Sequence, residues 1–127
     1  YRQHVRGIDE GKKILCFFSP GCGHCQDAVI EISKLSKQRK DFPEVYIIFM
    51  DEEAEKIPQF IKKSGRKFSY KLMDIASFYG LMGTTKDTPG VVYLWNGNVR
   101  AFFDGPVESS KNAFTSKKLL KALDKKK

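Results

Sequence analysis

Two cysteines separated by two residues form the segment Cys22-Gly23-His24-Cys25, and a third cysteine, Cys16, precedes them in the chain. A thiolate is a strong nucleophile, and a second thiol one helical turn further on can attack the mixed disulfide that the first one forms. The pattern therefore predicts thiol–disulfide exchange, with Cys22 as the attacking thiol and Cys25 as the resolving thiol. The odd number of cysteines argues against a framework of structural disulfides.

His24 lies between the two thiols. An imidazole beside a thiolate stabilises it, favours the dithiol form and makes the cysteine pair more oxidising. We therefore predict that His24, together with Gly23, tunes the redox potential. A solvated loop histidine with no such role is the alternative.

A zinc site and an inert cysteine pair are the competing interpretations of this segment. Structural zinc needs four ligands, and besides Cys22 and Cys25 the chain offers only Cys16, His24 and His4. We therefore expect no metal, and thiol–disulfide exchange requires no organic cofactor. A redox-inactive module that binds an extended partner segment without turnover stays open as the second interpretation.

An apolar strand and an amphipathic helix are expected to hold the cysteine pair. Residues 14–18 form a short apolar run that ends at Ser19-Pro20-Gly21, which is typical of a buried strand. Apolar residues then recur at helical spacing, namely Cys25, Ala28, Val29, Ile32 and Leu35. The first cysteine would thus lie at the start of a helix, where unpaired N–H groups favour a thiolate.

Further patterns predict the rest of the sheet and its helices. The expected strands lie at 45–50, 68–72, 91–95 and 98–103. The expected helices are a short one from about Ile57 with Gly65 as its C-cap, a second around 75–79 closed by Gly80, and a last one from about Ser116, with Ser116 as its N-cap. Asn96-Gly97, between the last two strands, is a strong hairpin signal. Alternating strands and helices followed by a hairpin predict an α/β fold, in which helices flank both faces of a central mixed β-sheet.

Length and charge narrow the possible classes of protein. The chain has 127 residues and a net charge of +8, which fits one domain over residues 1–127, with a loose lead-in at 1–12 and a basic tail at 125–127. The longest apolar run, Val45 to Met50, is too short to cross a membrane. No nucleic-acid motif accompanies the C-terminal lysines, so we interpret them as a solvated helix end rather than a nucleic-acid contact.

Two segments resemble the thioredoxin family: ILCFFSPGCGHC with the helix after it, and DTPGVVYLWNGNVRAFFDG. The resemblance extends from about Ile14 to Leu123 and implies a thioredoxin fold and an enzyme, a thiol–disulfide oxidoreductase. The CGHC form is that of protein disulfide isomerases. Residues 52–83 look more like the bacterial TlpA/ResA branch, whose members are exported, membrane-tethered reductases.

The resemblance also implies a substrate site. Pro89 matches the family's cis-proline opposite the cysteines, and the backbone of Thr88 would pair with an extended substrate; an ordinary trans turn is the alternative. Gly21 stands where a tryptophan is common, so the substrate face is expected to be flatter and more open. Residues 84–87 look like an insertion that could reshape the substrate groove.

Cys16 occupies the position of a buried acid that, in thioredoxin, helps to move protons to the resolving thiol. Without that acid, the proton of Cys25 would pass to water or to another group such as Glu31. The simpler interpretation, which we favour, is that Cys16 is a small buried apolar residue in a strand.

The resemblance implies protein thiols and disulfides as substrates, an upstream redox partner, and a monomer. It also implies a periplasmic or otherwise extracytoplasmic location, with a possible membrane tether outside the given sequence. The direction of electron flow stays open because it depends on the redox potential and on the partner. The TlpA/ResA likeness favours a reductase, whereas Gly-His between the cysteines favours an oxidase or isomerase.

Overall fold

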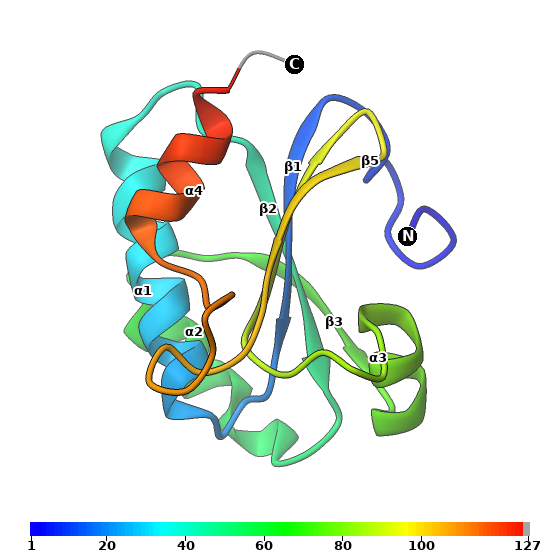
Figure 1. Ribbon diagram of the computed structural model, residues 1–127. Coiled ribbons are helices and arrows are strands. Elements are labelled where there is room, and N and C mark those ends of the chain that lie inside the picture. Colours follow the sequence, from blue (N-terminus) through cyan, green and yellow to red (C-terminus); the bar gives the residue numbers. More distant parts are fainter. Residues whose placement is uncertain (126–127) are drawn as a thin grey trace.

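The computed structural model describes residues 1–125; of the predicted basic tail, residues 126–127 lie outside the described part. The elements in chain order are β1 (Lys12–Phe18), α1 (Gly23–Gln38), β2 (Glu44–Met50), the 3-10 helix η1 (Ala54–Lys56), α2 (Ile57–Ser64), β3 (Ser69–Met73), α3 (Ile75–Met82), β4 (Gly90–Trp95), β5 (Asn98–Phe103) and α4 (Ser116–Leu123). The strand order is β3-β2-β1-β4-β5. Strands β1, β2 and β3 run parallel, whereas β4 is antiparallel to β1 and to β5. The predicted mixed sheet is therefore confirmed (Figure 1).

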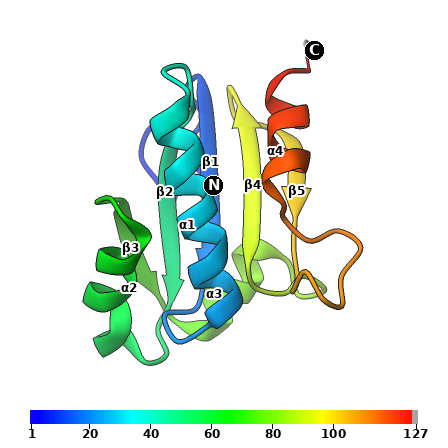
Figure 2. The ribbon, with the colours of Figure 1, turned by 90° about the vertical axis from the view of Figure 1, so that its left-hand side faces the viewer.

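Helices cover both faces of the sheet. Figures 1 and 2 show α1, α2 and α4 on one face and α3 on the other. Alternate residues of the central strand β1 supply the two cores: Ile14, Cys16 and Phe18 pack on the α1 side, and Leu15 and Phe17 pack on the α3 side. All five side chains are fully buried. Strand β1 is therefore held by packing on both faces of the sheet, and it fixes the loop that leads to the cysteine pair.

The segment before β1 packs more closely than the loose lead-in that we expected. Val5 and Ile8 are buried, and they join the apolar cluster on the α3 face of the sheet. The Lys71 ammonium also donates a hydrogen bond to the carbonyl of His4 at 3.1 Å. Among residues 1–125, no helix has both the length and the apolar character that a membrane span requires.

One predicted helix is longer than expected, and the N-cap of another differs by one residue. Helix α3 continues past Gly80 to Met82, which is buried, and Gly83 forms its C-cap with φ 120°. The N-cap of α4 is Thr115, whose hydroxyl accepts a hydrogen bond from the N–H of Lys118 at 3.2 Å. Burial of Met82 favours the longer helix, because its side chain packs on the α3 face of the sheet.

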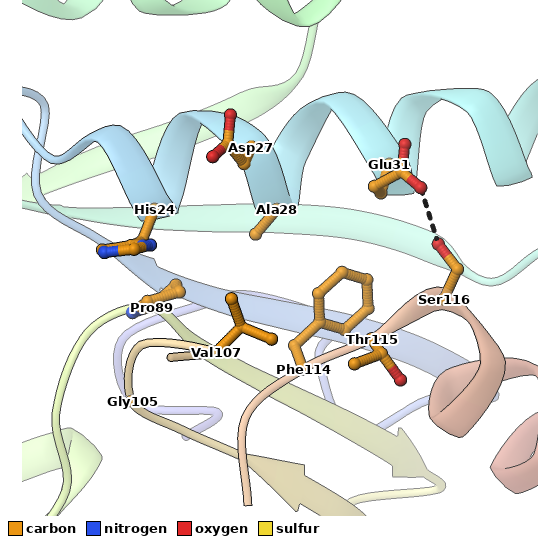
Figure 3. Close-up of a pocket in the computed structure, with 10 residues that line it drawn as sticks. All are labelled: His24, Asp27, Ala28, Glu31, Pro89, Gly105, Val107, Phe114, Thr115 and Ser116. Carbon is orange, nitrogen blue, oxygen red and sulfur yellow. Dashed lines mark hydrogen bonds between the residues drawn. The ribbon is translucent and has the colours of Figure 1, made fainter. Parts of the chain in front are cut away.

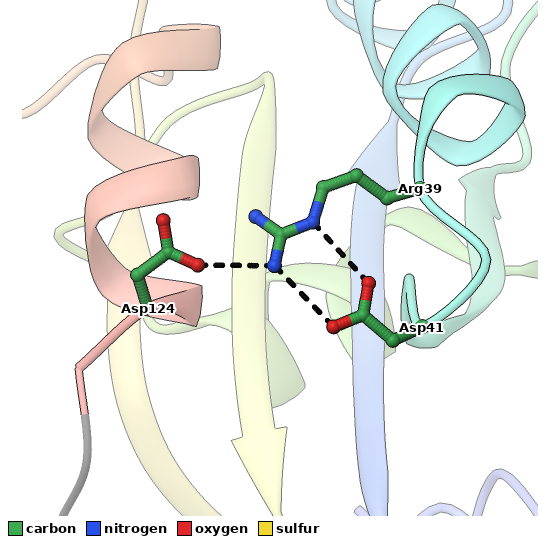
Figure 4. A network of polar contacts seen from close by, with 3 residues as sticks. All are labelled: Arg39, Asp41 and Asp124. Carbon is green, nitrogen blue, oxygen red and sulfur yellow. Dashed lines mark hydrogen bonds and ion pairs between the residues drawn. The ribbon is translucent and has the colours of Figure 1, made fainter.

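The C-terminal ends of α1 and α4 are joined by Arg39. Its guanidinium contacts the Asp124 carboxylate at 3.0 Å and the two carboxylate oxygens of Asp41 at 3.3 and 3.4 Å (Figure 4). The two helices lie on the same face of the sheet, and together they form walls of the groove described below. The ion pairs therefore link α1 and α4 at their C-terminal ends.

Candidate active site

Cys22 is the N-cap of α1, where the chain leaves strand β1. Its sulfur accepts a hydrogen bond from the backbone N–H of Cys25 at 3.3 Å, and its side chain is half-buried. A hydrogen bond from the Cys25 thiol, followed by backbone N–H groups and the charge of His24, lowers the pKa of Cys22 to about 6, although partial burial opposes the shift. At neutral pH, Cys22 is therefore mainly a thiolate.

Cys25 has the opposite protonation preference. It is fully buried, and this desolvation, together with the hydrogen bond to Cys22 and its negative charge, holds the Cys25 pKa well above its usual value. The N–H of Ser19, 3.5 Å from the Cys25 sulfur, and the hydroxyl of Thr88 offset part of the rise. The pair therefore consists of a thiolate facing solvent and a protonated thiol behind it.

Cys16 lies in the interior of β1, on the same face of the sheet as Cys25. It is fully buried in the apolar cluster under α1, and burial raises its pKa far above that of a free thiol. The structure thus places Cys16 as a small apolar core residue, the interpretation that we favoured.

The loop before β4 meets the start of α1, although the two segments are far apart in the sequence. The Thr88–Pro89 peptide bond is cis. Pro89 lines the same groove as His24, whose imidazole points from α1 towards it (Figure 3). The N–H of Thr88 donates to the Asp87 carboxylate at 2.8 Å. One of the backbone groups expected to receive a substrate is therefore already hydrogen-bonded within the loop.

A groove of about 270 Å³ extends from His24 along α1. Its lining residues are His24, Asp27, Ala28, Glu31, Pro89, Gly105, Val107, Phe114, Thr115 and Ser116 (Figure 3). At the end away from His24, the Glu31 carboxylate accepts a hydrogen bond from Ser116 at 3.2 Å and pairs with Lys34 at 3.3 Å. Glu31 is therefore directed towards α4, which does not support its suggested role beside the Cys25 thiol.

Gly21 is exposed, and the side chain of Glu53 lies beside it. A Cβ atom at Gly21 would overlap the carboxylate of Glu53, which pairs with Lys56 at 2.8 Å. Glu53 has φ 55°, in the left-handed region that few non-glycine residues adopt. Sequence reasoning missed Glu53 because its position depends on a loop conformation with no local signal.

Within residues 1–125, no group of three or more His, Cys, Asp or Glu side chains is arranged to hold a metal ion. The three cysteines all carry free thiols. The arrangement at the start of α1 is therefore that of a dithiol, with one sulfur at the surface and one beneath it.

No protein-family model matches the chain. A secreted disulfide oxidoreductase of Mycobacterium tuberculosis, homologous to E. coli DsbE, superposes with a TM-score of 0.70 at 14% identity, over 89% of this chain and 80% of that one. A thioredoxin-like protein solved in its oxidised form superposes with a TM-score of 0.69 at 16% identity, over 97% of this chain and 83% of the other. The chain has a thioredoxin fold.

The sequence itself is similar to Protein TlpB of Flavobacterium psychrophilum. The two are 47% identical over 105 residues, which make up 83% of this chain and 29% of TlpB. The chain thus spans under a third of that relative's length. At identities of 14% and 16%, the solved structures above establish the fold alone.

Proposed function

We propose that the protein is a thiol–disulfide oxidoreductase that exchanges disulfides with protein substrates through Cys22 and Cys25, and that it works as a reductase. The observation that carries the proposal is the contrast between the two thiols. The Cys22 pKa is lowered to about 6 at the helix start, whereas that of buried Cys25 is raised. A nucleophile at the surface and a protonated thiol behind it are what a two-step exchange requires.

The reaction begins with attack by the Cys22 thiolate on one sulfur of a substrate disulfide. A bond forms between Cys22 and that sulfur, the substrate S–S bond breaks, and the second substrate sulfur leaves as a thiolate that takes up a proton. Cys25 then loses its proton to water and attacks the Cys22 sulfur, which releases the first substrate sulfur as a thiolate. The substrate gains two electrons, the protein becomes a disulfide, and an upstream dithiol partner reduces it again.

The mixed disulfide also activates Cys25. The negative charge of Cys22 is one of the causes that raise the Cys25 pKa. Once Cys22 is bonded to a substrate sulfur, that charge is gone and the Cys25 pKa falls. The resolving thiol is therefore protected from reaction until the first step has taken place.

Substrate docking is assigned to the loop around Pro89 and to the surface beside Cys22. An extended substrate would pair with the backbone of Thr88, whose N–H would exchange its bond to Asp87 for one to a substrate carbonyl. A side chain at Gly23 would extend into open space, so the glycine leaves the approach to Cys22 clear. We assign the tuning of the potential to Gly23 and His24, because the charge of His24 lowers the Cys22 pKa.

The cellular setting follows from similarity. The M. tuberculosis protein with the same fold is described as secreted, and the chain is similar to TlpB and resembles the TlpA/ResA branch. These likenesses support a periplasmic or extracytoplasmic location and protein thiols as substrates. Our proposal also includes an upstream redox partner, a membrane tether in the whole protein, a monomer, and no binding of nucleic acid.

Reduction of insulin by dithiothreitol tests the proposal. We expect the wild-type protein to accelerate the precipitation of insulin chains, and a folded Cys22→Ser/Cys25→Ser double variant to leave it at the uncatalysed rate. Equal rates with both proteins would instead support a binding module without turnover. The direction is decided by equilibration with glutathione redox buffers: a reductase requires a potential closer to that of thioredoxin than to that of DsbA.

A further inference from the structure

A second hollow lies beside Cys22 and differs in charge from the groove of Figure 3. Its volume is about 320 Å³, and its lining residues are Pro20, Gly21, Cys22, Gly23, Gln26, Lys56, Gln59, Phe60 and Lys63. The Figure 3 groove is lined by the carboxylates of Asp27 and Glu31, whereas this hollow is lined by two ammonium groups and two amides. Cys22 is itself one of the lining residues.

The two lysines of this hollow come from η1, which contributes Lys56, and from α2, which contributes Lys63. The ammonium of Lys56 is bound to Glu53 at 2.8 Å, whereas Lys63 makes no ion pair with a carboxylate among residues 1–125. The amide nitrogen of Gln26 donates to the Phe60 carbonyl at 3.1 Å, which ties α1 to α2 across the hollow. The hollow is therefore built between two packed helices, and Lys63 contributes a positive charge that no described carboxylate neutralises.

A carboxylate of the chain already occupies the edge of the hollow. The Glu53 side chain extends over Gly21 and meets Lys56, so that a Cβ at Gly21 would overlap the carboxylate. The space between Gly21 and Lys56 therefore accommodates a carboxylate in the folded protein. The contact involves two of the lining residues, Gly21 and Lys56, and shows that a carboxylate fits beside them.

We propose that the hollow is a subsite for a substrate carboxylate, so that the preferred disulfides carry an acidic group next to the reacting sulfur. The inference rests on the proposed function, because it requires Cys22 to attack a substrate disulfide. In that step the Cys22–substrate bond forms and the second substrate sulfur leaves as a thiolate. A substrate carboxylate adds negative charge beside the single negative charge that passes from the Cys22 sulfur to the leaving sulfur, and Lys63 and Lys56 offset it.

Matched peptide disulfides test the subsite. Three short peptides differ only in the residue next to cysteine, which is Glu, Gln or Lys, and each cysteine is activated with the same uncharged 2-pyridyl group. The rate of thiopyridone release by the reduced protein is divided by the rate with 2-mercaptoethanol, which removes differences in intrinsic reactivity. We expect the Glu peptide to react about fivefold faster than the Lys peptide, and the difference to disappear in about 1 M salt.

Charge variants locate the effect. Lys63→Gln should reduce the preference for the Glu peptide to about twofold. Lys62→Gln is the matched control, because Lys62 is the neighbouring exposed lysine on α2, does not line the hollow and carries the same charge. It should leave the preference unchanged. Glu53→Gln should increase the preference, because it frees Lys56 for the substrate carboxylate.

Three outcomes would contradict the subsite, and one of them would contradict the proposed function as well. Equal normalised rates with the Glu and Lys peptides would overturn the subsite while leaving the exchange reaction intact. Equal losses of preference in Lys62→Gln and Lys63→Gln would also overturn it, because the net charge of the protein would then explain the selectivity. Failure of all three peptides to react would overturn the proposed function and the subsite together.

Discussion

The interior of β1 and the start of α1 each hold a cysteine, and the two side chains behave in opposite ways. Cys16 is surrounded by apolar side chains between sheet and helix, and burial raises its pKa. Cys22, a few residues later, caps a helix, receives hydrogen bonds and has a pKa of about 6. Because the side chains are identical, the difference shows that hydrogen-bond donors and access to water determine which thiol is a nucleophile.

Cys25 shares features of both regions. It is as deeply buried as Cys16, but it lies against the Cys22 sulfur. Its chemistry is therefore conditional: it reacts only when Cys22 has given up its negative charge. The environments of the thiols therefore also determine the order in which they react. Substitution of each of the three cysteines tests this difference.

The largest expected effect is that of removing the nucleophile. Cys22→Ser should reduce turnover by about a thousandfold or more, because an alcohol is not ionised at neutral pH and forms no mixed disulfide. The insulin assay measures the loss, and Cys16→Ala serves as the matched control. A Cys22→Ser protein with substantial activity would mean that another thiol carries out the attack.

The next largest effect is a difference in labelling rate between the two regions. The depressed pKa makes half of Cys22 thiolate at about pH 6, and the thiolate fraction falls as the pH drops below that value. Iodoacetamide should therefore label Cys22 with a half-maximal rate near pH 6, at least about 100-fold faster than Cys16 or Cys25. Peptide mass spectrometry of the folded, reduced protein identifies the site. Comparable labelling rates at all three cysteines would contradict the proposed difference in reactivity between the start of α1 and the interior of the protein.

Removing the resolving thiol should trap the intermediate. Cys25→Ser leaves the Cys22 thiolate in place but blocks its release, so we expect mixed disulfides with substrate proteins to accumulate and turnover to fall by at least about tenfold. Non-reducing electrophoresis followed by mass spectrometry detects the adducts. Adducts joined through Cys16 would contradict the assignment of the two regions.

Much of this contrast was predictable from the sequence, because its causes are local. The apolar run before Ser19-Pro20-Gly21 and the helical spacing after Cys22 lie within one short segment, so strand, turn and helix follow from neighbouring residues. The asymmetric environments of the cysteines then follow from their places in that unit. The cis bond at Pro89, in contrast, came only from the family resemblance.

Features that depend on contacts between distant segments were not predictable. Glu53 lies over Gly21, which is far from it in the sequence, and its own backbone has the left-handed conformation, with φ 55°. The sequence contains an acidic stretch at 52–55 but nothing that says where its side chains point. The position of the charged side chains beside Cys22 therefore became known only from the structure.

The cap of α4 shows the same limit on a smaller scale. Thr115 and Ser116 are both suitable N-cap residues, so the sequence does not choose between them. In the structure, Ser116 donates to Glu31 on α1, and Thr115 accepts the capping hydrogen bond. A tertiary contact therefore decides a local boundary.

A smaller effect is expected at His24, which modifies the exposed thiol without reacting. His24→Gln removes the charge that helps to lower the Cys22 pKa but keeps the backbone N–H, whereas His24→Pro removes both. Each change weakens the thiolate and therefore the dithiol form, so the reduction potential should fall, by about 30 mV or more in His24→Pro and by less in His24→Gln. Equilibration with glutathione measures both. An unchanged or raised potential would make His24 a bystander.

The smallest effect on activity is expected at Cys16, the buried member of the comparison. Cys16→Val keeps an apolar side chain in the cluster under α1, so insulin reduction and the labelling of Cys22 should stay within about twofold of wild type. Cys16→Ser buries a hydroxyl among apolar side chains and should lower the free energy of unfolding by about 1–3 kcal/mol, again with little change in activity. Urea denaturation of the reduced proteins measures the stability. A large loss of turnover in a stable Cys16→Val protein would show that the sulfur takes part in proton or disulfide transfer, and the interior of β1 would then belong to the active site.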